Sequence, residues 1–488
     1  MPNIVKITGT QLTAADVVAI ARSRADVELA PDVERRMSTS RQIVDDAVER
    51  GERVYGLTTS VGAKTGVALR QDQLAEFNRR ILLTHSVGHG PLASEESVRA
   101  TMAILLNAMA SGYLGVRPVL AQRLVNAINR RQTVPVHEWG SMGQSDMSSM
   151  SDLALGLFAG LDLMPGEGLA LINSSAFCTA MSTLALADLT ALLDSFTLVS
   201  ALSMEGYAAN PSIVTDAALT SRPFRGVQLH GERLRRYLQG SYLWAADGPR
   251  HMQDSLCFRS IPLIHGTAAD GLAYANEQLA VEVNAAQCNP IVSLSDRALV
   301  AVANFDMVSL TMALDIARLA FAPVVTSSTE RLSKMVDSFW SGLAGGLIEE
   351  DGVGATGFNG VALFHKSITS EARLLTVPLV GELASSSHSN GNMDRASMAA
   401  LGARRAAELA RLGTSIVAME LLTAAQAVEL RGRTPLGEAT KKLHDIVRQL
   451  VPFSQAGQTP PHVGPLLQLV GAGLKGLTRC GDDAAVSP

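Results

Sequence analysis

Apolar residues recur at helical spacing along almost the whole chain, and this periodicity limits the fold more than any other feature. No regular alternation of strands and helices accompanies it, and short strands are expected only near residues 4–8 and 53–57. The pattern therefore predicts a mainly α fold built from long helices that pack as a bundle. The longest stripe lies between residues 395 and 431 and advances by three, four and three residues: Leu409, Leu412, Ile416 and Met419.

The composition supports a folded protein with a large core. Hydrophobic residues make up 47% of the 488 residues, whereas aromatic residues make up only 4%. The net charge of −5 argues against nucleic acid or an anionic membrane as the main partner. The four cysteines are scattered and show no CxxC spacing, so we expect neither a disulfide framework nor a metal site.

The location of the protein is inferred from its N-terminus and from one apolar stretch. The first residues lack the basic segment and apolar run of a signal peptide. Residues 168–187 are uncharged, but they include Asn173 and several hydroxyl side chains. This stretch is typical of a helix buried in protein rather than of a membrane span. We therefore expect a cytoplasmic protein that does not insert into membranes.

Four polar clusters interrupt the helical pattern and are candidates for a functional site. In the first, Tyr55 stands among glycine, serine and threonine, as in a loop that carries a side chain over a site. In the last, Asn173 is expected inside an apolar helix, although an asparagine there can also satisfy backbone groups at a helix join. The clusters occupy residues 54–66, 79–90, 139–152 and 168–180.

Taken in order, these clusters resemble the histidine and phenylalanine ammonia-lyase family. The resemblance covers most of the chain and is carried by these segments: Tyr55–Thr59, Leu83–Ser86, Gly140–Gly143, Gly168–Asn173, Gln253–Asp254 with Arg259, Asn289–Pro290, Asn304–Phe305, Thr329–Arg331 and Ser397–Met398. It implies an ammonia-lyase-like long helical bundle with a smaller N-terminal active-site region. It places that region at residues 1–198 and the bundle at 199–488. It also implies a homotetramer whose active sites are shared between subunits.

Four positions depart from the family pattern. The family makes an electrophilic methylidene-imidazolone from an Ala-Ser-Gly triad, and the matching residues here are Gln144, Ser145 and Asp146. Ring closure requires the nitrogen of the third residue to approach a carbonyl closely, which glycine allows because it lacks a Cβ atom. We therefore expect that the electrophile does not form and that no cofactor is used. A catalytic tyrosine and a glutamate of the family fall on Leu256 and Met393.

The remaining residues still form a partial site. Tyr55 is expected to remove a β-proton as the catalytic base. Arg259, with Asn173, is expected to hold a substrate carboxylate, and Gln253 to orient the carboxylate or the leaving group. The resemblance places four further residues at the substrate: His85, Ser145, Asn359 and Met393. Lys366 follows Asn359 by seven residues on the same face of a predicted helix, and it is a candidate acid near the substrate ring. Lys366 is more typical of a solvated or paired helix lysine than of a catalytic acid, and Lys64 on the tyrosine loop is a similar candidate.

A lyase without the electrophile needs a better leaving group than an ordinary amine. A trimethylammonium group departs as neutral trimethylamine without covalent activation. One branch of the family, the ergothionases, eliminates trimethylamine from ergothioneine to give thiourocanate and works without the prosthetic group. The sequence therefore predicts a carbon–nitrogen lyase of this type that acts on a small-molecule, histidine-derived betaine. With few aromatic residues available for a cage, Asp146 is expected to face the cation.

Two alternatives remain open. One is an amino acid ammonia-lyase or aminomutase whose unusual triad still cyclises, and the other is a catalytically inactive relative that serves as a binding or scaffold protein. The retention of Tyr55, His85, Asn173 and Arg259 argues against the inactive protein, because such a site has no reason to keep a base and a carboxylate clamp.

Overall fold

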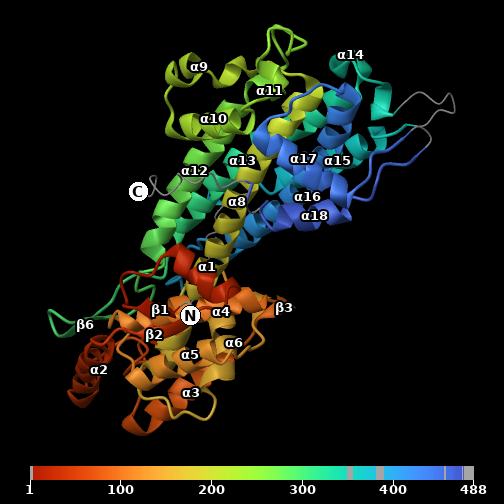
Figure 1. Cartoon of the computed structure of the whole chain (residues 1–488). Helices are drawn as coiled ribbons and strands as arrows, with labels where there is room; N and C mark the ends of the chain where they lie inside the picture. The colour runs from red at the N-terminus through yellow and green to blue at the C-terminus, as the bar shows by residue number, and fades with distance from the viewer. Residues whose placement is uncertain (1–3, 349–355, 381–388, 456–457, 475, 478–488) are drawn as a thin grey trace. The chain divides into compact units, whose positions relative to one another are not determined.

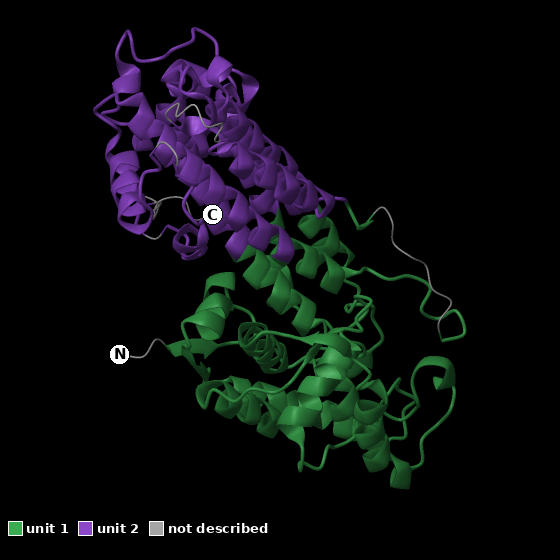
Figure 2. Cartoon of the chain, turned by 90° about the vertical axis from the view of Figure 1, so that its right-hand side faces the viewer, with its two compact units in different colours: residues 1–187, 275–315, 378–407 green, residues 188–274, 316–377, 408–488 purple. Residues whose placement is uncertain are grey.

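The computed structural model describes the chain except residues 1–3, 349–355, 381–388, 456–457, 475 and 478–488. Figure 1 shows long helices and only short strands, which confirms the mainly α fold. Figure 2 colours the two compact units of the chain. Unit 1 comprises residues 1–187, 275–315 and 378–407, and unit 2 comprises 188–274, 316–377 and 408–488. Both units are discontinuous in sequence, whereas the regions expected within the subunit, residues 1–198 and 199–488, are consecutive.

Unit 1 contains all the strands of the described chain, in three two-stranded sheets. β1 and β2 are parallel, whereas β3 pairs with β4 and β5 with β6 in antiparallel fashion. Its elements are β1 Ile4–Ile7, α1 Ala14–Arg22, β2 Asp26–Leu29, α2 Val33–Glu49, η1 Gly62–Lys64, η2 Gln71–Gln73, α3 Leu74–His85, β3 His89–Leu92, α4 Glu95–Ala110, α5 Pro118–Asn129, β4 His137–Trp139, α6 Met147–Phe158, α7 Glu167–Ile172, β5 Ile291–Ser293 and β6 Ala298–Val300.

Four long helices have residues in both units: α8 Ala176–Tyr207, α12 Ile261–Glu282, α13 Val308–Val336 and α16 Ala399–Arg431. The other elements of unit 2 are η3 Pro211–Val214, α9 Asp216–Thr220, α10 Arg225–Tyr237, η4 Tyr242–Trp244, α11 Leu256–Arg259, α14 Ser338–Ser341, η5 Gly345–Leu347, α15 Asn359–Leu374, α17 Glu438–Leu450 and α18 Gly464–Gly471.

The apolar stripes of the sequence form the core. α16 covers the predicted stripe, and all four of its stripe residues are buried: Leu409, Leu412, Ile416 and Met419. In unit 1, α4 is buried from Val98 to its last residue, Ala110, and packs against α1 and α5. The strand expected near residues 4–8 is β1, but residues 53–57 form a turn instead of a strand.

Two helical stretches are long and apolar enough to cross a membrane by length and composition alone. They are residues Glu167–Tyr207 and Val308–Val336, and 78% and 56% of their most apolar windows are buried inside the protein. Burial of this kind is typical of core helices, as expected for residues 168–187. Cys178, Cys257 and Cys288 are buried free thiols, while Cys480 lies outside the described residues.

A fully buried ion pair lies in the bundle of unit 2. The guanidinium of Arg331 on α13 donates two hydrogen bonds to Glu420 on α16, at 2.7 and 2.9 Å. Ser203 and Ser328 donate to the same carboxylate. Both charged side chains have no exposed surface, so each depends on the other to offset its lost hydration.

We predict that Glu420→Ala lowers the free energy of unfolding by about 3 kcal/mol, because it leaves the buried Arg331 charge unpaired. Glu408→Ala is the matched control on the same helix. Glu408 pairs with Arg411 at the surface, and its loss is expected to cost less than about 1 kcal/mol. Denaturant unfolding of both variants measures the difference, and equal losses would contradict the structural role of the buried pair.

Candidate active site

Unit 1 contains a cavity of about 500 Å³, which is the size of a small-ligand site. Four residues expected at the substrate from the sequence line it together: Tyr55, His85, Ser145 and Met393. The other lining residues are Val61, Gly62, Ala63, Val87, Gly140, Met142, Gln144, Met147, Ser148, Ser389 and Asn390. The cavity is therefore the candidate active site.

Tyr55 reaches this cavity from a turn that follows α2. The carbonyl of Val54 accepts the backbone N–H groups of Leu57 and Thr58 at 3.2 and 3.1 Å, which closes the turn. Gly56 has a φ of 67° in this turn, and a Cβ atom there would lie 2.1 Å from the Leu169 side chain. Glycine adopts this positive φ without strain and has no Cβ atom to collide with Leu169, so Gly56 allows the turn that carries Tyr55.

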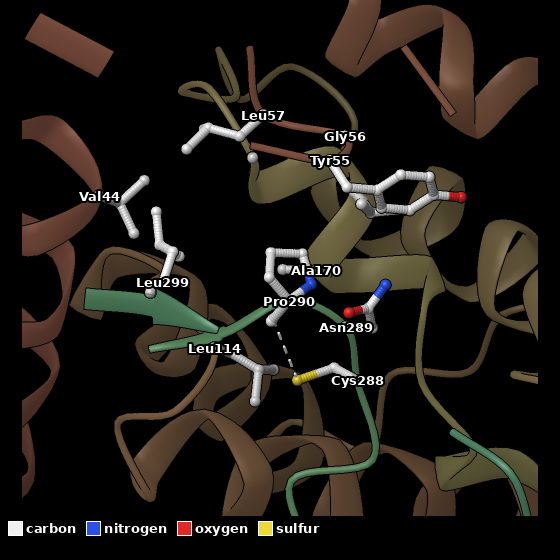
Figure 3. Close-up of a pocket in the computed structure, with 13 residues that line it drawn as sticks. Val44, Tyr55, Gly56, Leu57, Leu114, Ala170, Cys288, Asn289, Pro290 and Leu299 are labelled. Atoms are coloured by element: carbon white, nitrogen blue, oxygen red, sulfur yellow. Dashed lines mark hydrogen bonds between the residues drawn. The ribbon is translucent and has the colours of Figure 1, made fainter. Parts of the chain in front are cut away.

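The phenol oxygen of Tyr55 has a donor beside it. The backbone N–H of Gly62 donates to this oxygen at 3.2 Å, and both residues line the large cavity. The ring also borders a second, smaller cavity of about 30 Å³. Figure 3 shows the phenol hydroxyl pointing away from the side chains of Val44 and Leu57 in that smaller cavity. This orientation agrees with a role for the phenol in the larger one.

His85 is the last residue of α3, and its ring is held by that helix. Nδ1 lies 2.7 Å from the carbonyl oxygen of Ile81, so Nδ1 carries the proton and Nε2 carries the lone pair. The next residue, Ser86, donates to Asp152 at 2.8 Å. The other oxygen of Asp152 accepts the backbone N–H and Nδ1 of His137. Asp152 on α6 thereby anchors the chain that leaves His85.

The sequence suggested that Asn173 lies inside a helix, but the structure places it between two helices. α7 ends at Ile172 and α8 begins at Ala176, so Asn173 occupies the break between them. Its Oδ1 accepts the hydroxyl of Ser145, and its Nδ2 donates to the carbonyl oxygen of Asn289 at 2.6 Å. Asn173 is buried and is not among the residues that line the cavity. In this structure it positions Ser145 at a helix join and does not face the substrate space.

Asp146 does not face the cavity, so the expectation that it contacts a cationic leaving group is wrong. Its side chain has no exposed surface. One carboxylate oxygen accepts the hydroxyl of Ser141 at 2.5 Å, and the other accepts the backbone N–H of Cys178 at 2.7 Å. Burial raises the pKa of Asp146, and the donors at Ser141 and Cys178 oppose that rise. The carboxylate caps the N-terminus of α8, where a negative charge is stabilised.

The backbone at the triad position does not fit the formation of the family's prosthetic group. The nitrogen that would have to attack belongs to Asp146, and its N–H donates to the carbonyl oxygen of Ser174 at 2.8 Å. Ser145 has a φ of 63°, in the left-handed region. Cyclisation would break the bond to Ser174 and displace a side chain that is bonded at both oxygens.

Sequence reasoning missed several lining residues. Gln144 and Ser148 are buried in the cavity wall, and Gln144 Oε1 and Ser148 Oγ have no hydrogen-bond partner among the described residues. Met142 and Met147 also line the cavity. The triad alignment singled out Gln144 as a departure from the family, but no sequence signal showed that its side chain borders the ligand space.

The other expected site residues belong to unit 2. Arg259 ends α11, is partly buried, and donates from Nε to the carbonyl oxygen of Asp254 at 2.6 Å. Gln253 is exposed. Asn359 and Lys366 lie on α15, seven residues apart, and are exposed in this chain.

Neither Lys64 nor a metal site adds to the candidate site. Lys64 in unit 1 is exposed and is not among the residues that line the cavity. Among the described residues, no three His, Cys, Asp or Glu side chains gather as metal ligands would.

Comparison with known proteins identifies the family. The aromatic amino acid lyase family model matches residues 12–161 and 158–449. Histidine ammonia-lyase of Streptococcus sanguinis is 30% identical over 478 residues, covering 93% of this chain and 92% of that protein. Ergothionase from Treponema denticola, solved in complex with desmethyl-ergothioneine sulfonic acid, is 26% identical with a TM-score of 0.90, covering 97% of this chain and 99% of that chain.

Tyrosine aminomutase from Streptomyces globisporus is 25% identical with a TM-score of 0.89, and 97% of each chain is covered. These likenesses extend over nearly the full chain and agree with the helical fold described above. The chain belongs to the aromatic amino acid lyase family and is a carbon–nitrogen lyase.

Proposed function

We propose that this protein eliminates trimethylamine from a histidine-derived betaine such as ergothioneine, giving thiourocanate, without a methylidene-imidazolone group. The observation that carries the proposal is the triad position. Gln144, Ser145 and Asp146 replace the residues that cyclise, and Asp146 is bonded at its nitrogen and at both carboxylate oxygens. The cavity beside it nevertheless keeps Tyr55 and His85. A site that keeps a base but lacks the electrophile suits a substrate with its own good leaving group.

Tyr55 is the proposed base. Its phenol oxygen lies at the cavity with the N–H of Gly62 as a donor, which is the setting that a reacting phenolate requires. Tyr55 takes the proton from Cβ, and the electron pair of that C–H bond forms the Cα=Cβ double bond. The Cα–N bond breaks, and its electron pair leaves with nitrogen as neutral trimethylamine. Charge and atoms balance without another reactant.

The ring of the substrate is proposed to lie against the polar part of the cavity wall. The lone pair on His85 Nε2 and the unpartnered Oε1 of Gln144 are acceptors, and an imidazole-type ring carries N–H donors. The unpartnered hydroxyl of Ser148 supplies a donor or an acceptor. Protein atoms almost fully cover this oxygen and Gln144 Oε1, so a ligand reaches them after a rotation of those side chains. A buried polar atom without a partner is costly, so a ligand that satisfies these atoms gains affinity and specificity.

The substrate carboxylate is proposed to bind Arg259, with Gln253 close by and Asn359 and Lys366 at the ring. These residues match the family motifs, and in a homotetramer with shared active sites other subunits supply part of each site. A guanidinium binds a carboxylate through two parallel hydrogen bonds. A cytoplasmic tetramer acting on a small molecule is part of this proposal, and the likeness to histidine ammonia-lyases supports it.

One competing function is favoured by a specific observation. The curated relatives at about 30% identity are histidine ammonia-lyases, which favours deamination of an amino acid with an unusual triad that still cyclises. Deamination requires activation of an amino group, so the chemical state of residues 144–146 separates the two reactions.

The intact mass of the purified protein tests whether the electrophile forms. We predict the mass of the unmodified sequence, because the Asp146 nitrogen is engaged and its side chain is fixed. Loss of two waters, about 36 Da, would show that the triad cyclises and would favour the ammonia-lyase function. A histidine ammonia-lyase measured in parallel serves as the positive control.

Incubation with ergothioneine tests the substrate. The pure enzyme is expected to release trimethylamine and thiourocanate in equal amounts, whereas histidine should give no ammonia because an ordinary amine is a poor leaving group. Absence of both products from correctly assembled protein would reject the proposal. Release of ammonia from histidine would favour the alternative.

Removal of the phenol hydroxyl tests the base. Tyr55→Phe is expected to lower kcat at least about a hundredfold, the lower end of the usual contribution of general base catalysis, with no change in assembly. Tyr113→Phe, on an exposed tyrosine away from the cavity, is the control and should keep its activity. Near-normal turnover by Tyr55→Phe would remove Tyr55 from the mechanism.

A further inference from the structure

The cavity wall lacks the group that was expected to hold the cation. None of the lining residues that the structure describes is an aspartate or a glutamate, and Asp146 is bonded elsewhere. Tyr55 is the one phenol or indole side chain in that described lining, so this chain supplies no aromatic cage there. Three methionines line it instead: Met142, Met147 and Met393.

The chemistry of a quaternary ammonium group fits such a wall. It has no N–H donor, so it forms no N–H hydrogen bond and does not require an acceptor in the wall. Its charge is spread over three methyl groups, which present a bulky and weakly hydrated surface. The thioether of methionine is flexible and polarizable and adapts to irregular apolar shapes. A primary ammonium group, in contrast, would leave three N–H donors unpaired against the same wall.

The direction of the reaction also favours thioethers over a carboxylate. Positive charge on the nitrogen disappears as the C–N bond breaks, so a carboxylate would stabilise the bound substrate more than the transition state. Only interactions that are stronger in the transition state raise the rate. An uncharged wall holds the methyl groups and does not oppose the departure of a neutral amine.

We infer that Met142, Met147 and Met393 form the subsite for the trimethylammonium group and select a quaternary over a primary amine. Met393 lies on the segment after residue 388, Met142 lies before the triad position, and Met147 begins α6. All three are partly or largely accessible within this chain, so their thioethers are available to a ligand. This inference rests on the proposed function and assigns a selectivity to its site.

Equilibrium binding tests the subsite without requiring turnover. Ergothioneine and its unmethylated analogue 2-thiohistidine are titrated by calorimetry into the Tyr55→Phe variant. We expect ergothioneine to bind at least about tenfold more tightly. Met393→Gln, which is nearly isosteric, should reduce this preference about tenfold, because its amide oxygen accepts the N–H groups that only the analogue has. Met393→Leu should retain the preference.

Two further variants complete the design. Met142→Gln is an independent probe of the same wall, and Met164→Gln, at an exposed methionine outside the cavity, is the matched control that should leave both affinities unchanged. If both Met393→Gln and Met142→Gln alter the two affinities equally, or alter neither, the subsite is refuted. If the binding preference behaves as expected while the wild type releases no trimethylamine, the proposed reaction fails and the selectivity of the site stands.

Discussion

The buried carboxylate of Asp146 is the constraint on which the cavity depends. It bonds Ser141 on one side and the start of α8, at Cys178, on the other. Its backbone nitrogen is bonded to Ser174, at the break between α7 and α8. These three hydrogen bonds fix Asp146 and the backbone before it. Asn173 accepts the hydroxyl of the preceding residue, Ser145. A charge buried without partners is strongly unfavourable, so the buried carboxylate of Asp146 requires all of these hydrogen bonds together.

This constraint has a chemical consequence. In a family that builds its electrophile from the backbone at this position, a side chain bonded at both oxygens turns the same backbone into a rigid support. The activation that the electrophile would supply must then come from the substrate. In the proposed reaction, a trimethylammonium leaving group supplies it, and an uncharged methionine wall lets the neutral amine depart. The proposed base, the triad backbone that does not fit cyclisation and the wall without acidic residues are together consistent with that reaction.

The sequence was sufficient to predict the long helices and four of the residues that line the candidate site. A period of 3.6 residues over 30 or more positions specifies a buried helix face, as in α16, and motif order predicted Tyr55, His85 and Ser145. It failed where tertiary contacts decide the outcome. Asp146 precedes α6 with φ −92° and ψ 48°, and a rotation there decides whether its carboxylate meets the cavity or the end of α8.

The same limit explains the lining residues that the sequence did not reveal. Met142 and Met147 lie in the polar cluster at residues 139–152, but the sequence did not show that their side chains border a cavity, because that depends on loops distant in the chain.

The most direct test of electrophile-free elimination is trimethylamine release after borohydride treatment, which reduces a methylidene-imidazolone. The account predicts undiminished release, while a histidine ammonia-lyase treated alongside loses its activity. Parallel inactivation of both enzymes would contradict it.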